Sequence, residues 1–121
     1  MISGVVLNDE AIVRLVVKDA QGNVEPVEFV VDTGFSGSIC VPPSLTLSLA
    51  CPHAFQTPAI LADGRIKWLD SVELTLDWDG EERLVDALVI SGQPLLGMRA
   101  LRGSELTLEI SEGGLATISP L

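Results

Sequence analysis

The chain has 121 residues, a length that suits one domain and is too short for two separate hydrophobic cores. Its residues are 47% hydrophobic and 20% charged, which is the composition of a folded globular protein. The formal net charge of −10 makes nucleic acids and anionic membranes poor partners, because both are themselves negatively charged. We therefore expect a single domain over residues 1–121 that binds neither.

The first residues and the few cysteines bear on location and cofactors. The first apolar stretch lacks a basic n-region and soon meets Asp9 and Glu10, so it does not resemble a signal peptide. No apolar run approaches the roughly 20 residues of a membrane-spanning helix, so we expect a cytoplasmic protein with reduced thiols. Cys40, Cys51 and His53 are too few for a zinc centre and lack its spacing. No metal or other cofactor is expected.

Short strand patterns separated by turn residues begin near the N-terminus, as they do in β-sandwiches and β-barrels. The β-branched stretch 11–17 and the alternating stretch 24–31 are expected to form a hairpin around a turn at residues 19–23. A small, polar loop over residues 32–38 then leads into a short apolar strand at residues 39–41.

The second half of the chain continues this pattern. Residues 44–50 suit either a helix capped by Ser44 or a strand, and both remain open. An Asp-Gly turn within residues 62–64 is expected to join two strands in a hairpin. Further strands are expected at residues 72–76, 83–90, 106–110 and 115–118, with one helical turn at residues 98–101. The sequence thus predicts an all-β domain with one or two short helices.

The most unusual feature is a carboxylate at the end of an apolar strand. Residues 29–31 are Phe-Val-Val, and they run directly into Asp32-Thr33-Gly34. Burying a carboxylate costs free energy unless it is hydrogen-bonded or protonated, so an Asp at this place requires an explanation. Asp and Gly are also ordinary turn formers, so the tripeptide by itself is compatible with a plain turn.

The wider pattern resembles a known family. The run VVDTGFSGSICVP (residues 30–42) resembles the active-site segment of clan AA aspartic proteases, the group of retroviral proteases and pepsin. Downstream, ALVISGQPLLGMRAL (residues 87–101) resembles the second half of such a lobe. The hairpin tip Ala62-Asp63-Gly64 lies between them, where the family places its flap. The order is similar over residues 11–118, closest in pattern to small single-lobe bacterial and archaeal members.

The resemblance implies a closed β-barrel of the retropepsin type with Asp32 as its catalytic residue. Thr33 would form hydrogen bonds between two active-site loops, Gly34 would let the backbone approach the substrate, and residues 62–64 would cover the cleft. The chemistry needs two carboxylates, one to activate water and one to donate a proton. Because the chain has a single Asp-Thr-Gly, the resemblance implies a homodimeric endopeptidase that cleaves peptides or proteins.

Two residues depart from the viral members of this family. Phe35 follows the Gly where those members carry a small residue, and its ring is expected to narrow the cleft. Met98 stands where they place an Arg that ties the helix to the active-site loop. Phe35 favours the main rival hypothesis, a catalytically weak or inactive dimeric module that binds peptides or acts as a scaffold on the same fold. A third hypothesis is an unrelated β-barrel subunit in which Asp-Thr-Gly is only a turn.

Other chemistries fit the sequence less well. The loop at residues 34–38 lacks the Gly-Lys-Ser/Thr end of a phosphate loop and the Gly-x-Ser-x-Gly spacing of a nucleophile elbow. His53 is expected on a surface loop, and Cys40 is expected to be a small buried side chain rather than a nucleophile. Trp68 is expected in the core or at the dimer interface rather than against substrate. Trp78 is expected in partial surface packing.

Overall fold

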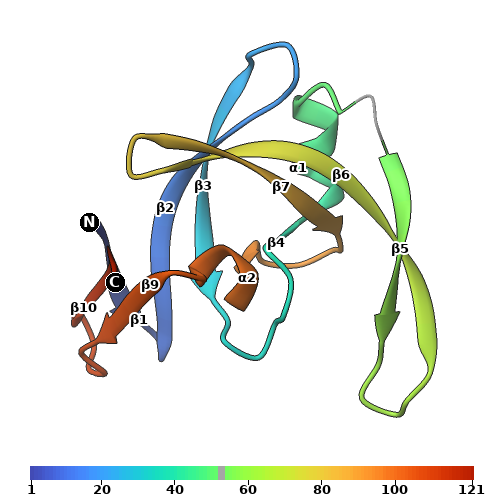
Figure 1. The fold of residues 1–121 in the computed structure, drawn as a ribbon. Coiled ribbons are helices and arrows are strands. Elements are labelled where there is room, and N and C mark those ends of the chain that lie inside the picture. Colours follow the sequence, from blue (N-terminus) through green and yellow to red (C-terminus); the bar gives the residue numbers. More distant parts are fainter. Residues whose placement is uncertain (52–53) are drawn as a thin grey trace.

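The computed structural model describes residues 1–51 and 54–121, which form ten strands and two short helices (Figure 1). The strands are β1 (Ile2–Leu7), β2 (Glu10–Lys18), β3 (Val24–Val31), β4 (Ile39–Val41), β5 (Ala54–Ile60), β6 (Ile66–Trp78), β7 (Glu81–Val89), β8 (Leu95–Leu96), β9 (Ser104–Leu108) and β10 (Leu115–Pro120). The helices are α1 (Pro43–Ser48) and α2 (Met98–Leu101). The expected all-β class with two short helices is confirmed. His53, expected on a surface loop, lies outside the described residues.

The predicted hairpin of β2 and β3 is confirmed, and alternation of side chains explains it. Val13, Leu15 and Val17 of β2 are buried, while the residues between them face outward. Val13 pairs with Phe29 of β3, so both large side chains enter the core from one face of the hairpin. The turn between the strands uses Gly22, whose φ of 85° lies in the left-handed region that suits glycine.

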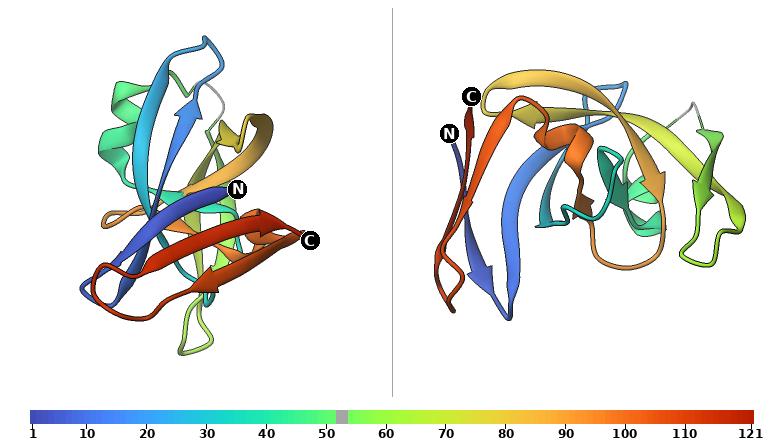
Figure 2. Two further views of the ribbon diagram at one scale, coloured as in Figure 1. Left: turned by 90° about the vertical axis from the view of Figure 1, so that its left-hand side faces the viewer. Right: turned by 60° about the horizontal axis from the view of Figure 1, so that its bottom comes forward.

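The sheet returns on itself. Its strands follow the order β5-β6-β7-β4-β8-β3-β2-β1-β10-β9, and an additional pairing joins β6 to β2 through Val17 and Leu76. Most neighbours are antiparallel, but β3 runs parallel to β8 and β4 runs parallel to β7. Strands β2, β3, β8, β4, β7 and β6 therefore form a ring of paired strands, seen from two sides in Figure 2. Strands β1, β10 and β9 extend from its β2 side.

The main core lies inside this ring and includes the fully buried Phe29, Leu74, Leu76 and Leu96. Trp78 also belongs to it, with only 6% of its surface exposed. The expectation of partial surface packing for Trp78 is therefore wrong. From Val72 onward the even-numbered positions of β6 face the core, and this alternation continues up to the turn at residues 79–80.

Strand β6 is longer than predicted and leaves the body of the molecule at its N-terminal end. One strand of 13 residues covers what the sequence pattern divided in two. Together with β5 and the turn at residues 61–65, its first part forms a projecting arm, defined here as residues 54–70 (Figure 1). Trp68 on the arm is 62% exposed, so the expected core position for it is wrong, and the dimer-facing alternative stays a prediction. Ile60 and Ile66 on the same arm are likewise exposed.

Two further predictions need correction. Residues 43–48 are helical, which decides the alternative left open for this segment, but the N-cap is Pro42 rather than Ser44. Proline at the first helical position fits because the first turn requires no amide donor. The last long strand expected to reach residue 110 ends at Leu108, and Ile110 is 72% exposed. In the described part of the chain, neither helix has the length and apolar character needed to cross a membrane.

Candidate active site

Strand β3 delivers Asp32 to the surface at a fixed place beside β8. The amide of Asp32 donates a hydrogen bond of 2.9 Å to the carbonyl of Leu96, and the amide of Val30 donates one of 2.9 Å to Pro94. These bonds extend the parallel pairing of β3 and β8 by one residue. The backbone of Asp32 is therefore held by the core, although the residue itself no longer belongs to a strand.

The carboxylate of Asp32 is oriented by the turn that follows it. The amide of Gly34 donates a hydrogen bond of 2.9 Å to Oδ1 of Asp32. The amide of Phe35 donates one of 3.1 Å to the backbone carbonyl oxygen of Asp32. The predicted turn is thus present, and Asp32 is half-buried within it. A carboxylate offers about four acceptor positions, so a single hydrogen bond from the described residues leaves most of them free for a ligand.

Helix α2 fastens the loop that carries Asp32. The amides of Gly97, Met98 and Arg99 donate hydrogen bonds of 2.9, 2.8 and 3.1 Å to the carbonyls of Ser38, Phe35 and Gly37, respectively. The backbone of residues 97–99 therefore ties this helix to the loop. Met98, which the resemblance aligned with an Arg of the viral family members, is exposed.

The ring of Phe35 packs against Gly37 and Gly97, which together are called its seat below. A Cβ atom placed on Gly37 would lie 2.5 Å from Cζ of the ring, and one placed on Gly97 would lie 2.5 Å from Cδ2. Both distances are too short for real contacts, so the ring occupies space that any larger residue at either position would fill. The sequence pattern did not indicate this role for Gly37 or Gly97. The bulky Phe35 followed closely by Gly37 was the available signal.

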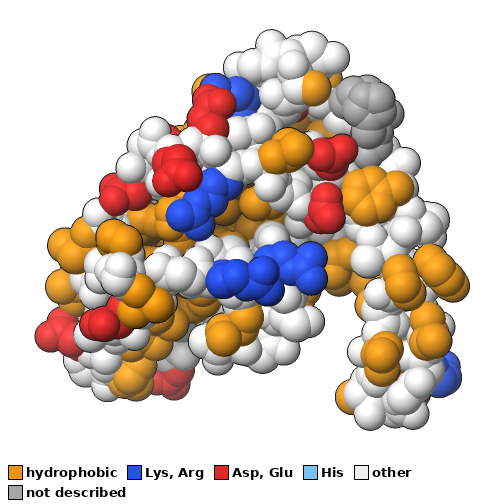
Figure 3. Space-filling model, viewed as in Figure 1, with side chains coloured by type: hydrophobic (Ala, Val, Ile, Leu, Met, Phe, Trp, Pro, Cys, Tyr) orange, Lys and Arg blue, Asp and Glu red, His pale blue; other side chains and the backbone are white. Residues whose placement is uncertain are grey.

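A groove of about 660 Å³ separates this loop from the arm. Asp32, Phe35 and Ile39 line one side, Thr57 and Leu69 of the arm line the other, and strands β7 and β8 also contribute. The space-filling view shows the arm standing away from the body, with hydrophobic side chains gathered on it (Figure 3). The volume is in the range of small-ligand sites, and three other hollows are smaller, at about 150, 290 and 230 Å³.

Charged residues within the groove are few. Among the described residues that line it, Asp32 and Asp86 are acidic and Arg99 is basic, and most of the others are apolar. Asp86 and Arg99 were not identified as groove residues from the sequence, because β7 and α2 reach the groove only through tertiary packing. The groove suits a ligand that is largely apolar and meets a carboxylate at one place.

The predicted flap tip forms the turn expected of it but does not line the groove. The lining on the arm ends at Leu61, so Ala62, Asp63 and Gly64 lie beyond it. Gly64 has a φ of 85°, and the amide of Arg65 donates a hydrogen bond of 3.0 Å to Oδ1 of Asp63. That amide, followed by the Arg65 side chain, lowers the pKa of Asp63.

Thr33 and Cys40 occupy different surroundings beside Asp32. Thr33 is exposed, so the hydrogen bonds expected between two loops remain a prediction about a partner. Cys40 is buried at the groove, as expected of a small core residue. Burial, with a further contribution from the Asp32 charge, raises the pKa of its thiol to about 11. The thiol is therefore protonated at neutral pH, which makes it a poor nucleophile.

Neither a metal site nor a similarity to other proteins adds an assignment. In residues 1–51 and 54–121, no group of three or more His, Cys, Asp or Glu side chains is arranged to hold a metal ion. Comparisons of the chain with protein-family models, with curated proteins and with solved structures found no match.

Proposed function

We propose that this protein is an aspartic endopeptidase that acts as a homodimer, with one Asp32 contributed by each copy. The observation that carries the proposal is the placement of Asp32, fixed by β8 and Gly34 yet with most of its acceptor positions free at the groove. In this proposal the ring of strands is the single-lobe barrel of a retropepsin-like protease.

Two adjacent carboxylates that share one proton suit peptide hydrolysis. Like charges at close range do not both ionise readily, so one Asp32 is ionised while the other keeps the proton. The ionised carboxylate takes a proton from water as the water attacks the peptide carbonyl, and the protonated one donates to the carbonyl oxygen. The carboxylate that took the water proton then gives it to the nitrogen, and the other carboxylate takes a proton from a diol hydroxyl. The C–N bond breaks, and the pair again holds one proton. An extended peptide suits the groove, because the backbone of the arm is already in strand form.

Within one chain, the other carboxylate at the groove is Asp86, but its setting differs from that of Asp32. Asp86 lies within β7, paired with Glu73 of β6, and no glycine turn presents it. Asp32 instead stands at a loop whose neighbour Thr33 is exposed and available to a second copy. This difference supports a pair formed between two copies rather than within one.

A mixing experiment tests the shared site. The wild type and Asp32→Asn are combined in increasing ratios, allowed to exchange subunits, and assayed for cleavage of a peptide library at constant total protein. If each site needs two Asp32 residues, an equal mixture retains about one quarter of the wild-type activity, because random pairing leaves that share of intact dimers. A self-sufficient monomer would instead retain about half.

Two controls sharpen the result. Asp86→Asn should remain active if the pair forms between copies, whereas an Asp32–Asp86 pair within one chain requires that this variant be inactive. Thermal unfolding should also depend on protein concentration, because dimerisation stabilises the folded state by mass action. A strictly monomeric protein at micromolar concentrations would contradict the proposal.

The rival is a dimeric module that binds peptides without cleaving them, and the position of Phe35 at the groove favours it. Binding and cleavage separate the two functions. A peptidase binds and cleaves, and its Asp32→Asn variant binds without cleaving. A binding module retains peptides unchanged with either residue at position 32.

A further inference from the structure

The ring of Phe35 has two surroundings at once. One part of it packs against Gly37 and Gly97, since a Cβ atom on either glycine would meet the ring at 2.5 Å. The residue is nonetheless only half-buried, and it lines the groove together with Asp32. The ring therefore packs against the two glycines with one part and borders the groove with another.

Phe35 is three residues from the proposed catalytic Asp32 and is hydrogen-bonded to it through the backbone. Its amide donates to the carbonyl of Asp32, and its own carbonyl accepts from Met98 of α2. The backbone on both sides of the ring is thus tied to elements that the core holds. The Cα atom of Phe35 is therefore held in place beside Asp32, and the close contact with Gly37 and Gly97 leaves the ring little room on their side.

We propose that Phe35 is a specificity-determining residue: its ring forms an apolar wall beside Asp32 and limits the size of the substrate side chain next to the scissile bond. This inference rests on the proposed function for the existence of a scissile bond. The size limit itself concerns the groove and can be measured by binding as well.

The two glycines provide a test of the seat. Around Gly37, all three atoms nearest to an added Cβ belong to the Phe35 ring, at 2.5, 2.8 and 3.4 Å. Around Gly97, the nearest atom is the carbonyl oxygen of Gly37, at 2.2 Å. A clash created by Gly37→Ala is therefore relieved when the ring is removed, whereas a clash created by Gly97→Ala is not.

The experiment uses a series of peptides in which the residues on either side of the scissile bond increase in size from Ala through Val and Leu to Phe. The wild type should favour the smaller members. Phe35→Ala should raise the kcat/KM ratio of the Phe peptide over the Ala peptide by about tenfold or more, the range expected when apolar volume is opened in a pocket. Phe35→Leu should lie between the two.

Gly37→Ala should turn the ring into the groove and lower kcat/KM, most strongly for the larger peptides. The double variant Phe35→Ala/Gly37→Ala should behave like Phe35→Ala alone, because the atoms that clash are gone. Gly97→Ala should have a lowered kcat/KM, and adding Phe35→Ala should not restore it, because the clash with the Gly37 carbonyl remains. Circular dichroism and thermal unfolding establish that each variant compared is folded, and Phe35→Leu serves as the test variant if Phe35→Ala does not fold.

The outcomes distinguish this inference from the proposed function. Cleavage by the wild type with an unchanged size preference in folded Phe35→Ala and Phe35→Leu overturns the role of Phe35 and leaves the peptidase intact. If no variant cleaves, but fluorescence anisotropy shows that Phe35→Ala binds larger peptides than the wild type does, the proposed peptidase activity is overturned. The proposed role of the Phe35 ring as a size limit is then supported. A protein that neither cleaves nor binds these peptides overturns both.

Discussion

Asp19 and Asp32 end the two strands of one hairpin, and the same local bond forms at each. Asp19 directly follows β2, and Asp32 directly follows β3. In both cases Oδ1 accepts a hydrogen bond of 2.9 Å from the amide two residues later, that of Gln21 or Gly34. The two carboxylates differ in what else surrounds them.

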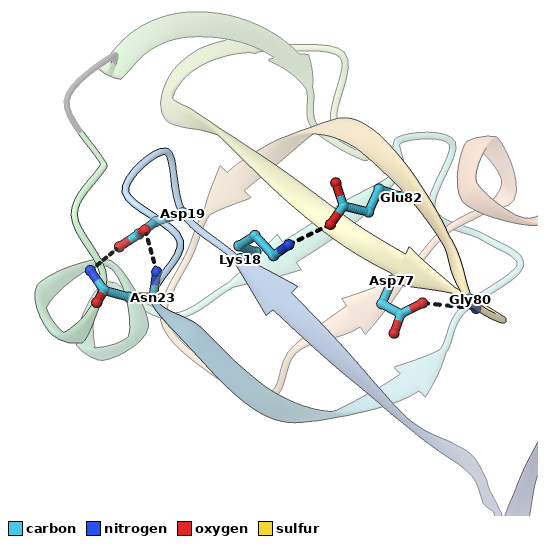
Figure 4. Close-up of polar contacts among 6 residues, drawn as sticks. All are labelled: Lys18, Asp19, Asn23, Asp77, Gly80 and Glu82. Atoms are coloured by element: carbon cyan, nitrogen blue, oxygen red, sulfur yellow. Dashed lines mark hydrogen bonds and ion pairs between the residues drawn. The ribbon is translucent and has the colours of Figure 1, made fainter.

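Asp19 is surrounded by donors. Its Oδ1 also accepts from the amide of Asn23 at 2.9 Å, and its Oδ2 accepts from the Asn23 side chain at 2.8 Å and from the amide of Ala50 at 2.7 Å (Figure 4 shows the contacts with Asn23). The residue is 4% exposed. It therefore connects the hairpin turn to the segment that follows α1, and its acceptor positions are occupied.

Asp32 has the same turn geometry with most of its acceptor positions free, and they face the groove. An Asp directly after a strand is therefore not sufficient to identify a catalytic residue. The number of donors already bonded to the carboxylate, and the space beside it, distinguish a structural carboxylate from one that is available for chemistry.

The largest expected effect is on activity, and it comes from Asp32→Asn. This change removes the base and the shared proton, so kcat should fall by at least about 10²–10⁴-fold, the contribution of general acid–base catalysis. The fold should be unaffected, because an Asn side-chain oxygen can still accept from Gly34. Peptide cleavage and thermal unfolding are measured on the same sample. A variant that loses stability along with activity would make Asp32 resemble Asp19.

The second prediction concerns the pH dependence of wild-type activity. Below the acid limb both Asp32 carboxylates are protonated and no base remains, and above the alkaline limb both are ionised and no proton donor remains. We expect a bell-shaped profile of kcat/KM, because only the singly protonated pair offers both a base and a proton donor. The Cys40 thiol, with a pKa of about 11, adds no step near neutrality. A single rise near neutrality would instead implicate His53 and remove the aspartic mechanism.

The third prediction concerns Asp19→Asn, which should lower stability and leave activity unchanged, the opposite of Asp32→Asn. In Asp19→Asn, an amide NH₂ replaces one oxygen and faces donors where an acceptor is needed, so Tm should fall clearly. Peptide cleavage at a temperature where the variant is folded should remain close to that of the wild type. Asp19→Asn and Asp32→Asn together therefore form a matched pair, one that changes stability and one that changes turnover.

The pH dependence of unfolding provides a check on Asp19. Burial alone would raise the pKa of this carboxyl, but its hydrogen bonds from Asn23, Ala50 and Gln21 outweigh burial and lower the pKa. A lowered pKa in the folded state stabilises the protein above the ordinary value near 3.9, and this contribution is lost as pH falls through the folded value. The Tm difference between the wild type and Asp19→Asn should therefore narrow below about pH 4. A difference that is constant down to pH 2 would contradict this role.

Local patterns in the sequence predicted most of the fold. The turn at residues 19–23, the loop at 32–38 and the Asp-Gly hairpin at 62–64 are each fixed by neighbouring residues, and each is present. The partial surface packing expected of Trp78 and the core position expected of Trp68 were wrong, because both depend on where β6 leaves the body. Trp68 and Trp78 lie on the same strand with the same alternation, and only one of them has a core beside it.

In the candidate site, too, local features could be predicted from the sequence and contacts between distant segments could not. Asp32 could be identified from an apolar strand that runs into Asp-Thr-Gly. Its contrast with Asp19 could not, because Ala50 donates from 31 positions away. The seat of Phe35 likewise depends on Gly97, which only folding brings against the loop. Contacts between distant segments determine which carboxylates remain available, and short sequence patterns carry no information on them.

The smallest expected effect concerns the arm and uses two matched glycines. Gly64 at the tip of the arm and Gly80 between β6 and β7 have φ values of 85° and 88°, and a Cβ at either would meet no atom within 4 Å. Gly64→Ala and Gly80→Ala should therefore each cost about 1 kcal/mol through backbone strain alone, and equally. If the arm closes over bound peptide, Gly64→Ala should in addition lower kcat a few-fold, because the turn must adjust as the arm moves. The residues of the tip do not line the groove, so a larger effect is not expected. Equal kcat values for the two variants, with equal losses of stability, would argue that the tip takes no part in covering the Asp32 groove.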